Sequence, residues 1–188
     1  MAFVSVVDSG ASRAASIQEA ECYRDRHKRP LQVFPCKTRV EETMEFARRM
    51  GYKKLGIAFC GGVHREAAIL TRVLENHGFD VVSVMCKVGR VPKQRIGLAP
   101  QEQIVQESPE EAMCNPIAQA EILNAAETEF NIMLGLCVGH DALFIKHVYA
   151  YTTILAVKDR VLGHNPMAAL YQTTSYYRRL MDDNPGDT

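Results

Sequence analysis

Four short apolar runs, each of the length of a β-strand, alternate with segments of helical character from Thr38 onwards. The runs occupy residues 55–60, 79–86, 130–137 and 152–158. Strands that alternate with helices in this way form parallel sheets with helices on both faces. We therefore expect an α/β domain of three layers around a four-stranded, mainly parallel sheet. Right-handed crossovers favour the strand order 2-1-3-4, with the four runs counted along the chain.

The helical segments are bounded by residues that are typical of helix termini. Thr38 predicts a helix cap with Glu41 as its capping-box partner, and Gly51 is expected to end that helix. Helices are expected over 12–28, 40–50, 64–78, 117–128, 142–148 and 167–181. Ser108 and Pro109 predict one further helix start. The segment between the second and third strands, 87–106, has no clear period and is expected to be a loop.

These patterns divide the chain into three parts. Residues 1–36 are expected to form an N-terminal arm whose role the pattern does not define. Residues 37–181 are expected to form a single α/β domain, and residues 182–188 a frayed tail.

The charges and the apolar runs argue against nucleic acid and membrane as partners. The 22 basic and 22 acidic residues give a formal net charge of zero, so no excess positive charge is present to bind nucleic acid. No apolar run reaches the roughly 18–20 residues that a membrane span requires. The N-terminal residues lack the basic start of a signal peptide, so we expect a cytoplasmic protein. The sequence leaves a homo-oligomer open.

Three of the four predicted strands end in a cysteine, at Cys60, Cys86 and Cys137. Disulfides are rare in the cytoplasm, so the thiols require another explanation. The plain alternative is that free cysteine packs as a small hydrophobic residue. The carboxyl ends of parallel strands, however, meet at one edge of the sheet, where ligands bind in open α/β folds. Because adjacent strands are about 4.8 Å apart, we expect the three thiols to converge on one site.

Cys114 is expected at the same edge, because it precedes a helix that begins at Asn115-Pro116 and leads into the third strand. Four thiolates complete a tetrahedral zinc site or hold an iron–sulfur cluster. The sequence therefore predicts a metal or cluster site with four ligands: Cys60, Cys86, Cys114 and Cys137. The chain has no close CxxC pair, the strongest sequence indication of zinc.

Two glycines and a lysine are expected to bind a small-molecule or anionic ligand at this edge. Gly61 and Gly62 follow the first strand, where their backbone N–H groups either bind an anion or only permit a tight turn. Lys158 follows the fourth strand, and a solvated turn is its alternative role.

A metal-free thiol enzyme is the competing interpretation. Its catalytic groups would be Cys137, His140 and Asp141, with Cys137 as nucleophile and His140 as base. Asp141 has a second reading, as the cap of the following helix. A module that senses a small anion at Gly61 and Gly62 is the third interpretation.

Five longer segments resemble a known protein family. They are GYKKLGIAFCGG, VVSVMCKVG, MCNPIAQAEILN, LCVGHDALFIKH and VKDRVLGHNPMAALY. They resemble the uncharacterised metal-binding proteins grouped as domain of unknown function 1847, from about Thr38 to Tyr171. The resemblance implies a metal-binding protein of a kind that occurs in anaerobic bacteria and archaea, with no established reaction. Its motif cysteines correspond to Cys60, Cys86, Cys114 and Cys137.

The N-terminal region departs from the pattern of that family. Many members resemble one another in an N-terminal segment with close cysteine pairs, whereas this chain has only Cys22 and Cys36 there. We expect these two cysteines to be incidental or to form an auxiliary site. Soft thiolate ligands suit zinc or iron–sulfur clusters, and the anaerobic family favours a cluster, with redox or sulfur chemistry as the expected function.

Overall fold

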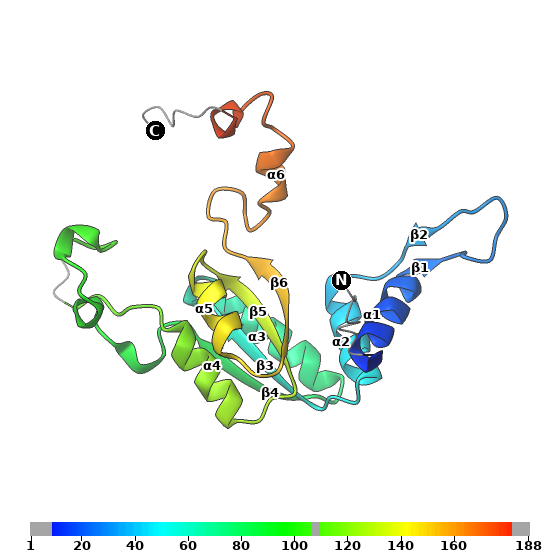
Figure 1. The fold of residues 1–188 in the computed structure, drawn as a ribbon, viewed down its shortest axis with the longest axis horizontal. Coiled ribbons are helices and arrows are strands. Elements are labelled where there is room, and N and C mark those ends of the chain that lie inside the picture. The colour runs from blue at the N-terminus through cyan, green and yellow to red at the C-terminus, as the bar shows by residue number, and fades with distance from the viewer. Residues whose placement is uncertain (1–8, 107–109, 182–188) are drawn as a thin grey trace, which may run out of the picture.

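The main sheet of the protein has four parallel strands. The computed structural model describes residues 9–106 and 110–181 (Figure 1). The strands are β3 (Lys54–Phe59), β4 (Asp80–Met85), β5 (Phe130–Leu136) and β6 (Tyr151–Val157). They lie in the order β4-β3-β5-β6. Two short strands precede this sheet in the chain, so the observed order is the predicted order 2-1-3-4.

Four helices pack against this sheet, and their ends follow the expected chemistry. They are α2 (Arg39–Arg49), α3 (His64–Asn76), α4 (Pro116–Ala125) and α5 (His140–His147). The predicted capping box at the start of α2 is confirmed. The Thr38 backbone N–H donates to Glu41 Oε2 at 2.6 Å, and the Glu41 N–H donates to the Thr38 hydroxyl at 3.4 Å. Gly51 follows the helix with a φ of +79°, which favours glycine.

The buried side chains form two clusters, and neighbouring residues of β3 belong to different clusters. Leu55 and Ile57 pack with buried residues of α2 and α3. Ala58 packs with Leu123 of α4 and Phe144 of α5. Successive side chains of a strand point to opposite faces of a sheet. The two clusters therefore lie on opposite faces of β3.

The centre of the sheet is tightly packed at Gly56. A Cβ at this position would lie 2.0 Å from Oδ1 of Asn131 on β5. The Asn131 side chain is fully buried, and its Oδ1 accepts a hydrogen bond from the Thr128 hydroxyl at 2.8 Å. Asn131 therefore cannot give way without losing that bond, and β3 requires a glycine here.

The N-terminal region forms a helix and a small hairpin. These are α1 (Ser9–Glu21), β1 (Tyr23–Arg24) and β2 (Phe34–Pro35). The helix ends at Glu21 and not at residue 28, because the chain enters the β1–β2 ladder at Tyr23. α1 lies against α2 (Figure 1). Gln18 donates to Glu45 at 2.8 Å, and Arg49 pairs with Glu21 at 2.5 Å.

The segment after β4 is a loop, as predicted. Its 3₁₀ turns are Val88–Arg90, Lys93–Ile96 and Pro100–Glu102. Lys93 fixes the loop to a later part of the chain, because its Nζ lies 2.9 Å from Glu111 Oε1 and its N–H donates to the Glu111 carbonyl oxygen. The helix start predicted at Ser108 and Pro109 falls outside the described residues, apart from a turn at residue 110.

The C-terminal segment differs most from the prediction. α6 covers only Met167–Leu170, and a short 3₁₀ turn, Arg178–Leu180, follows. The continuous helix predicted over 167–181 is therefore wrong. Beyond Leu170 the backbone bonds span three residues, as in turns: the Gln172 N–H donates to the Ala169 carbonyl oxygen at 3.1 Å and the Ser175 N–H to that of Gln172 at 3.0 Å. The predicted tail, 182–188, lies outside the described residues.

The C-terminal segment stands away from the sheet, beyond the end of β6 (Figure 1). In the part of the chain that the structure describes, no helix is long and apolar enough to cross a membrane.

Candidate thiol site

Three cysteines lie at the carboxyl edge of the main sheet. Cys60 directly follows β3, Cys86 follows β4 and Cys137 follows β5. The backbone hydrogen bonds between the strands extend as far as Cys60 and Cys86. The Cys86 N–H donates to the Phe59 carbonyl oxygen at 2.8 Å, and the Cys60 N–H donates to that of Leu134 at 3.1 Å. The strand ends therefore deliver these cysteines to one edge, as the sequence predicted.

Cys114 joins this edge through the residue that follows it. The Asn115 backbone N–H donates to the Cys86 carbonyl oxygen at 2.6 Å. The Asn115 side chain accepts a hydrogen bond from the Ala118 N–H at 3.0 Å and so caps α4. Asn115 therefore both starts the helix and fixes Cys114 beside Cys86.

Three of the thiols form a row in space, in which each thiol contacts the next. The sulfurs of Cys86 and Cys114 are 3.7 Å apart and share a hydrogen bond. The Cys60 thiol is hydrogen-bonded to that of Cys86. Cys86 is therefore the middle member of a row of three thiols. Cys137 is near enough for its charge to act on Cys114, but its sulfur accepts a hydrogen bond from Arg160 Nη2 at 3.2 Å.

The glycine turn after β3 directs its backbone N–H groups at two of these sulfurs. The Gly61 N–H donates to Cys86 Sγ at 3.4 Å, and the Gly62 N–H donates to Cys60 Sγ at 3.5 Å. A Cβ on Gly62 would lie 3.3 Å from Lys158 Nζ and 3.8 Å from Cys60 Sγ. The three residues predicted to bind an anion therefore border the thiols, and both N–H groups serve sulfur.

The hydrogen bonds between the thiols give them different pKa values. The hydrogen bond with Cys86 lowers the pKa of Cys114 to about 7, and the charge of Lys87 acts in the same direction. The pKa of Cys60 rises to about 12, first because of its hydrogen bond to Cys86 and then because of burial. The hydrogen bond with Cys114 also raises the pKa of Cys86. Cys114 therefore ionises first, with neutral thiols beside it.

Positive charge surrounds the thiols. Lys158 acts on Cys60, Lys87 acts on Cys114, and Arg160 contacts Cys137. The nearby carboxylate of Asp159 is engaged in its own turn, where it accepts hydrogen bonds from the N–H groups of Val161 and Leu162 at 3.0 and 2.8 Å. This arrangement favours thiolates or a bound anion.

His140 and Asp141 begin α5, three and four residues after Cys137. Their backbone N–H groups both donate to the Cys137 carbonyl oxygen at 3.0 Å. Gly139 occupies the cap position, and Asp141 Oδ1 accepts from the Ala142 N–H at 2.7 Å, so the alternative role of Asp141 as the helix cap is wrong. Within residues 9–106 and 110–181, no hydrogen bond joins either side chain to the four thiols. Their predicted catalytic roles stay predictions.

The thiols do not form a closed metal site as they stand. Among the described residues, no group of three or more His, Cys, Asp or Glu side chains is arranged to hold a metal ion. The thiols nevertheless suit a soft metal, because Cys60, Cys86 and Cys114 lie in a row and Cys137 is close enough to act on Cys114 by its charge. The zinc and iron–sulfur assignments stay predictions.

The other two cysteines lie together in the N-terminal region. Cys22 and Cys36 flank the β1–β2 ladder, where the Cys36 N–H donates to the Cys22 carbonyl oxygen at 2.8 Å. Cys22 is buried, which raises the pKa of its thiol, whereas Cys36 is exposed. The pair is separate from the thiol row, which begins at Cys60.

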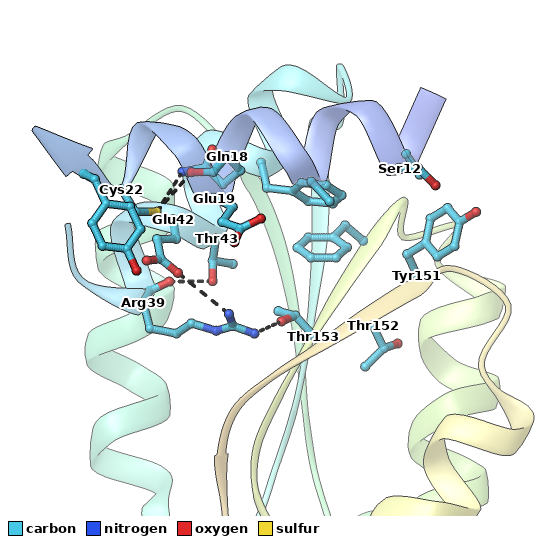
Figure 2. Close-up of a pocket in the computed structure, with 15 residues that line it drawn as sticks. Ser12, Gln18, Glu19, Cys22, Arg39, Glu42, Thr43, Tyr151, Thr152 and Thr153 are labelled. Atoms are coloured by element: carbon cyan, nitrogen blue, oxygen red, sulfur yellow. Dashed lines mark hydrogen bonds and ion pairs between the residues drawn. The ribbon is translucent and has the colours of Figure 1, made fainter. Parts of the chain in front are cut away.

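A cavity of about 620 Å³ lies where β5 and β6 begin (Figure 2). α1 and α2 form one wall, and Tyr151, Thr152 and Thr153 of β6 form another. Arg39 crosses it, with Nη2 donating to the Thr153 hydroxyl at 2.8 Å. The sequence did not predict this cavity, because its lining comes from elements that are distant in the chain. The thiols follow the opposite ends of the strands.

Three residues of the thiol site had little sequence signal. The sequence pattern predicts no role for Arg160 or Lys87, and it predicts for Asn115 only the start of a helix. Their roles depend on distances between strand ends, which a linear pattern does not contain. The position of Arg160 two residues after Lys158 was the one available indication.

Comparisons with known proteins give relatives but no activity. The model of a family described as protein of unknown function (DUF1847) matches residues 5–155. The uncharacterized protein MJ0455 of Methanocaldococcus jannaschii is 49% identical over 146 residues, which are 78% of this chain and 72% of that protein. No solved structure matches.

Proposed function

Because the chain belongs to the DUF1847 family of proteins of unknown function, we propose its function from the chemistry of its own thiols. The thiols of Cys60, Cys86, Cys114 and Cys137 bind a soft metal centre, an iron–sulfur cluster in preference to zinc. The centre serves redox or sulfur chemistry. The observation that carries this proposal is the 3.7 Å contact between the Cys86 and Cys114 sulfurs, with Cys60 hydrogen-bonded to the same Cys86.

The protonation of the thiols supports metal binding. Metals bind thiolates, so binding displaces thiol protons. Cys114 has a pKa of about 7 and loses its proton near neutral pH. Cys86 and Cys60 keep theirs in hydrogen bonds between sulfurs. A bound metal would take the place of these protons, with Cys60, Cys86 and Cys114 as its ligands.

The residues around the sulfurs supply the polar environment of such a centre. A bound cluster provides electron transfer or sulfur chemistry, and hydrogen bonds to its sulfurs set its potential. The N–H groups of Gly61 and Gly62 already donate to two of the ligand sulfurs. Lys158 and Arg160 offset the negative charge of the thiolates.

We also propose a three-layer arrangement for the domain, with the sheet between α2 and α3 on one side and α4 and α5 on the other. A cytoplasmic location is part of the same proposal, because reduced thiols persist in that compartment.

A metal-free thiol enzyme is the second candidate, and the electrostatics favour a different nucleophile from the predicted Cys137. Cys114 is partly accessible, its pKa is about 7, and the Cys86 thiol lies 3.7 Å away. A thiolate at neutral pH is the reactive form of cysteine. Cys114 is therefore the first choice as nucleophile in this candidate.

Anaerobic purification followed by metal analysis tests the first proposal. We expect bound iron and sulfide, with visible absorption at roughly 400 nm from thiolate–iron charge transfer. Replacing Cys60, Cys86, Cys114 or Cys137 by alanine is expected to reduce the bound metal about 10-fold or more. Cys36→Ala is the matched control, because Cys36 is an exposed cysteine outside the site.

A colourless protein that contains no metal and takes up neither Fe²⁺ with sulfide nor Zn²⁺ would overturn the metal proposal. Selective alkylation of Cys114 in that same protein would then support the second candidate. Equal and slow reaction of all thiols would contradict the second candidate.

A further inference from the structure

Cys86 and Cys114 are placed so that a disulfide bond can form between them. Their sulfurs are 3.7 Å apart, whereas the two sulfurs of a disulfide are about 2.05 Å apart. The Asn115 N–H donates to the Cys86 carbonyl oxygen at 2.6 Å, so the two main chains lie side by side at the cysteines. Cysteines whose main chains lie far apart cannot be bridged without backbone movement. In this pair the side chains have to close a gap of less than about 2 Å.

The two sulfurs differ in their access to solvent. Cys86 is only 3% exposed and packs with Ala58 and Val84, whereas Cys114 is partly exposed. A reagent in solution therefore reaches Cys114 and not Cys86. Because Cys86 contacts the Cys114 sulfur directly, it is in place to displace a group that has become bound there. An accessible thiol next to a second thiol is the arrangement of an attacking and a resolving cysteine.

Three cations border the thiols and have no carboxylate as a partner. Lys158 Nζ lies beside the turn after β3, 3.3 Å from the place that a Cβ on Gly62 would take. Arg160 Nη2 donates to a thiol sulfur at 3.2 Å, and the charge of Lys87 reaches the thiol row. In the part of the chain that the structure describes, no ion pair joins Lys87, Lys158 or Arg160 to an acidic side chain. Their charge is therefore available to attract an anionic molecule to the sulfurs.

We infer that Cys86 and Cys114 carry out thiol–disulfide exchange with a small anionic disulfide. The Cys114 thiolate attacks one sulfur of that disulfide, whose S–S bond breaks and whose other half leaves as a thiolate. Cys86 Sγ then attacks Cys114 Sγ, and the second half of the substrate leaves. The two protein thiols are oxidised to a disulfide, and the substrate is reduced to two thiols. The two leaving thiolates take up the two protons that the cysteines lose.

The exchange uses two of the ligands of the proposed metal centre and takes place in the metal-free chain. Metals bind thiolates, so the Cys86–Cys114 disulfide removes both cysteines from the ligand set, and its reduction restores them. The disulfide therefore also controls whether the site can bind a metal. This consequence rests on the proposed function, whereas the exchange itself does not.

Peptide mapping of the metal-free full chain tests the exchange. The reduced chain is incubated with oxidised glutathione, an anionic disulfide, and its remaining thiols are blocked before digestion without a reductant. We expect the Cys86–Cys114 disulfide as the main product, with release of reduced glutathione. Cys86→Ser stops the second step, so glutathione is expected to stay bound to Cys114. Cys36→Ala is the matched control that leaves the product unchanged, and circular dichroism checks that each variant is folded.

A second disulfide tests the charge of the substrate. Cystamine is also a small disulfide, but it is cationic. The measured quantity is the rate with oxidised glutathione divided by the rate with cystamine. Lys158→Ala combined with Arg160→Ala should lower this ratio about 10-fold, because the attraction of the anionic substrate is lost. Lys146→Ala removes an exposed lysine from the last turn of α5, outside the thiol site, and leaves the ratio unchanged.

Failure of the exchange is a different result from failure of the metal proposal. If excess oxidised glutathione gives no Cys86–Cys114 disulfide, or gives Cys60–Cys86 as the main disulfide, the inference is overturned, even where the reduced chain binds metal. A ratio of rates that the double variant leaves unchanged overturns the anionic class of the substrate. The Cys86–Cys114 disulfide in a chain that binds no metal supports the exchange, although the metal proposal then fails.

Discussion

The Cys86 and Cys114 sulfurs lie 3.7 Å apart although 28 residues separate them in the chain. The backbone of Asn115 creates this contact, because its N–H donates to the Cys86 carbonyl oxygen at 2.6 Å. The contact places a thiol of low pKa beside one of raised pKa. Within this row of three thiols, Cys114 is therefore the first to ionise.

The acidity of Cys114 can be measured by the pH dependence of alkylation in the metal-free protein. Only the thiolate reacts, so the rate at Cys114 is expected to reach half its maximum near pH 7. Cys86→Ala removes the hydrogen bond that lowers this pKa, and the midpoint moves up towards the ordinary value of 9.0. Mass spectrometry of the labelled peptides follows the rate. Cys22→Ala is the control, and a midpoint that stays unchanged in Cys86→Ala contradicts the assignment.

The side chain of Asn115 is expected to affect stability and not thiol acidity. Asn115→Ala removes the α4 cap, which costs about 1 kcal/mol in unfolding free energy, but it keeps the backbone N–H that donates to the Cys86 carbonyl oxygen. The alkylation midpoint of Cys114 should therefore be the same in this variant as in the unmodified chain. Asn115→Ser keeps a capping oxygen and is the conservative control. Chemical denaturation and alkylation measure the two properties, and a shifted midpoint would show that the side chain of Asn115 also positions Cys114.

Gly56→Ala tests the packing between β3 and β5. The added methyl group meets Asn131 Oδ1 at 2.0 Å, and overpacking of this kind costs about 1–3 kcal/mol. Asn131→Ala removes the obstruction, so the cost of Gly56→Ala should be smaller in the double variant. The midpoint of urea denaturation reports each step. Equal costs in the two backgrounds would rule out a direct clash.

Glu129 makes a contribution that depends on pH. Its carboxylate accepts hydrogen bonds from the N–H groups of Lys54 and Lys53 at 2.8 and 2.7 Å, which lower its pKa. A lowered folded-state pKa means that this stabilisation is fully present above the unfolded value of 4.5 and is lost as pH falls through the folded value. Glu129→Ala should therefore cost about 1 kcal/mol or less at pH 7, because the group is exposed, and progressively less on acidification. Glu121→Ala on α4 is the exposed control. A cost that stays constant down to pH 3 would exclude the carboxylate as its source.

The order of the sheet and the positions of its cysteines followed from the sequence because they depend on local pattern. Apolar runs of strand length, separated by helices, determine a parallel sheet, and a parallel sheet determines a common edge. Cys60, Cys86 and Cys137 then reach that edge by position alone. The capping box of Thr38 and Glu41 was predictable for the same reason, since both partners are three residues apart.

The features that escaped prediction depend on contacts between distant residues. Arg160 reaches Cys137 across 23 positions, and the cavity is lined by residues from Ala11 to Thr153. The last helix was overestimated because residues 167–181 are compatible with a helix by composition. Beyond Leu170 its backbone hydrogen bonds span three residues, as from Ser175 to Gln172, and composition does not reveal this change.

The two ends of the loop after β4 lie side by side. The Met113 N–H donates to the Val91 carbonyl oxygen at 2.8 Å, and the Asn115 N–H donates to the Cys86 carbonyl oxygen at 2.6 Å. These two hydrogen bonds hold the two ends of the loop together. The entropy of closing a loop rises only slowly with its length, about 0.6 kcal/mol for each doubling. The length of this loop is therefore uncoupled from the position of Cys114. Relatives can gain or lose residues there, and a label or a small domain can be inserted, while the four thiols keep their arrangement.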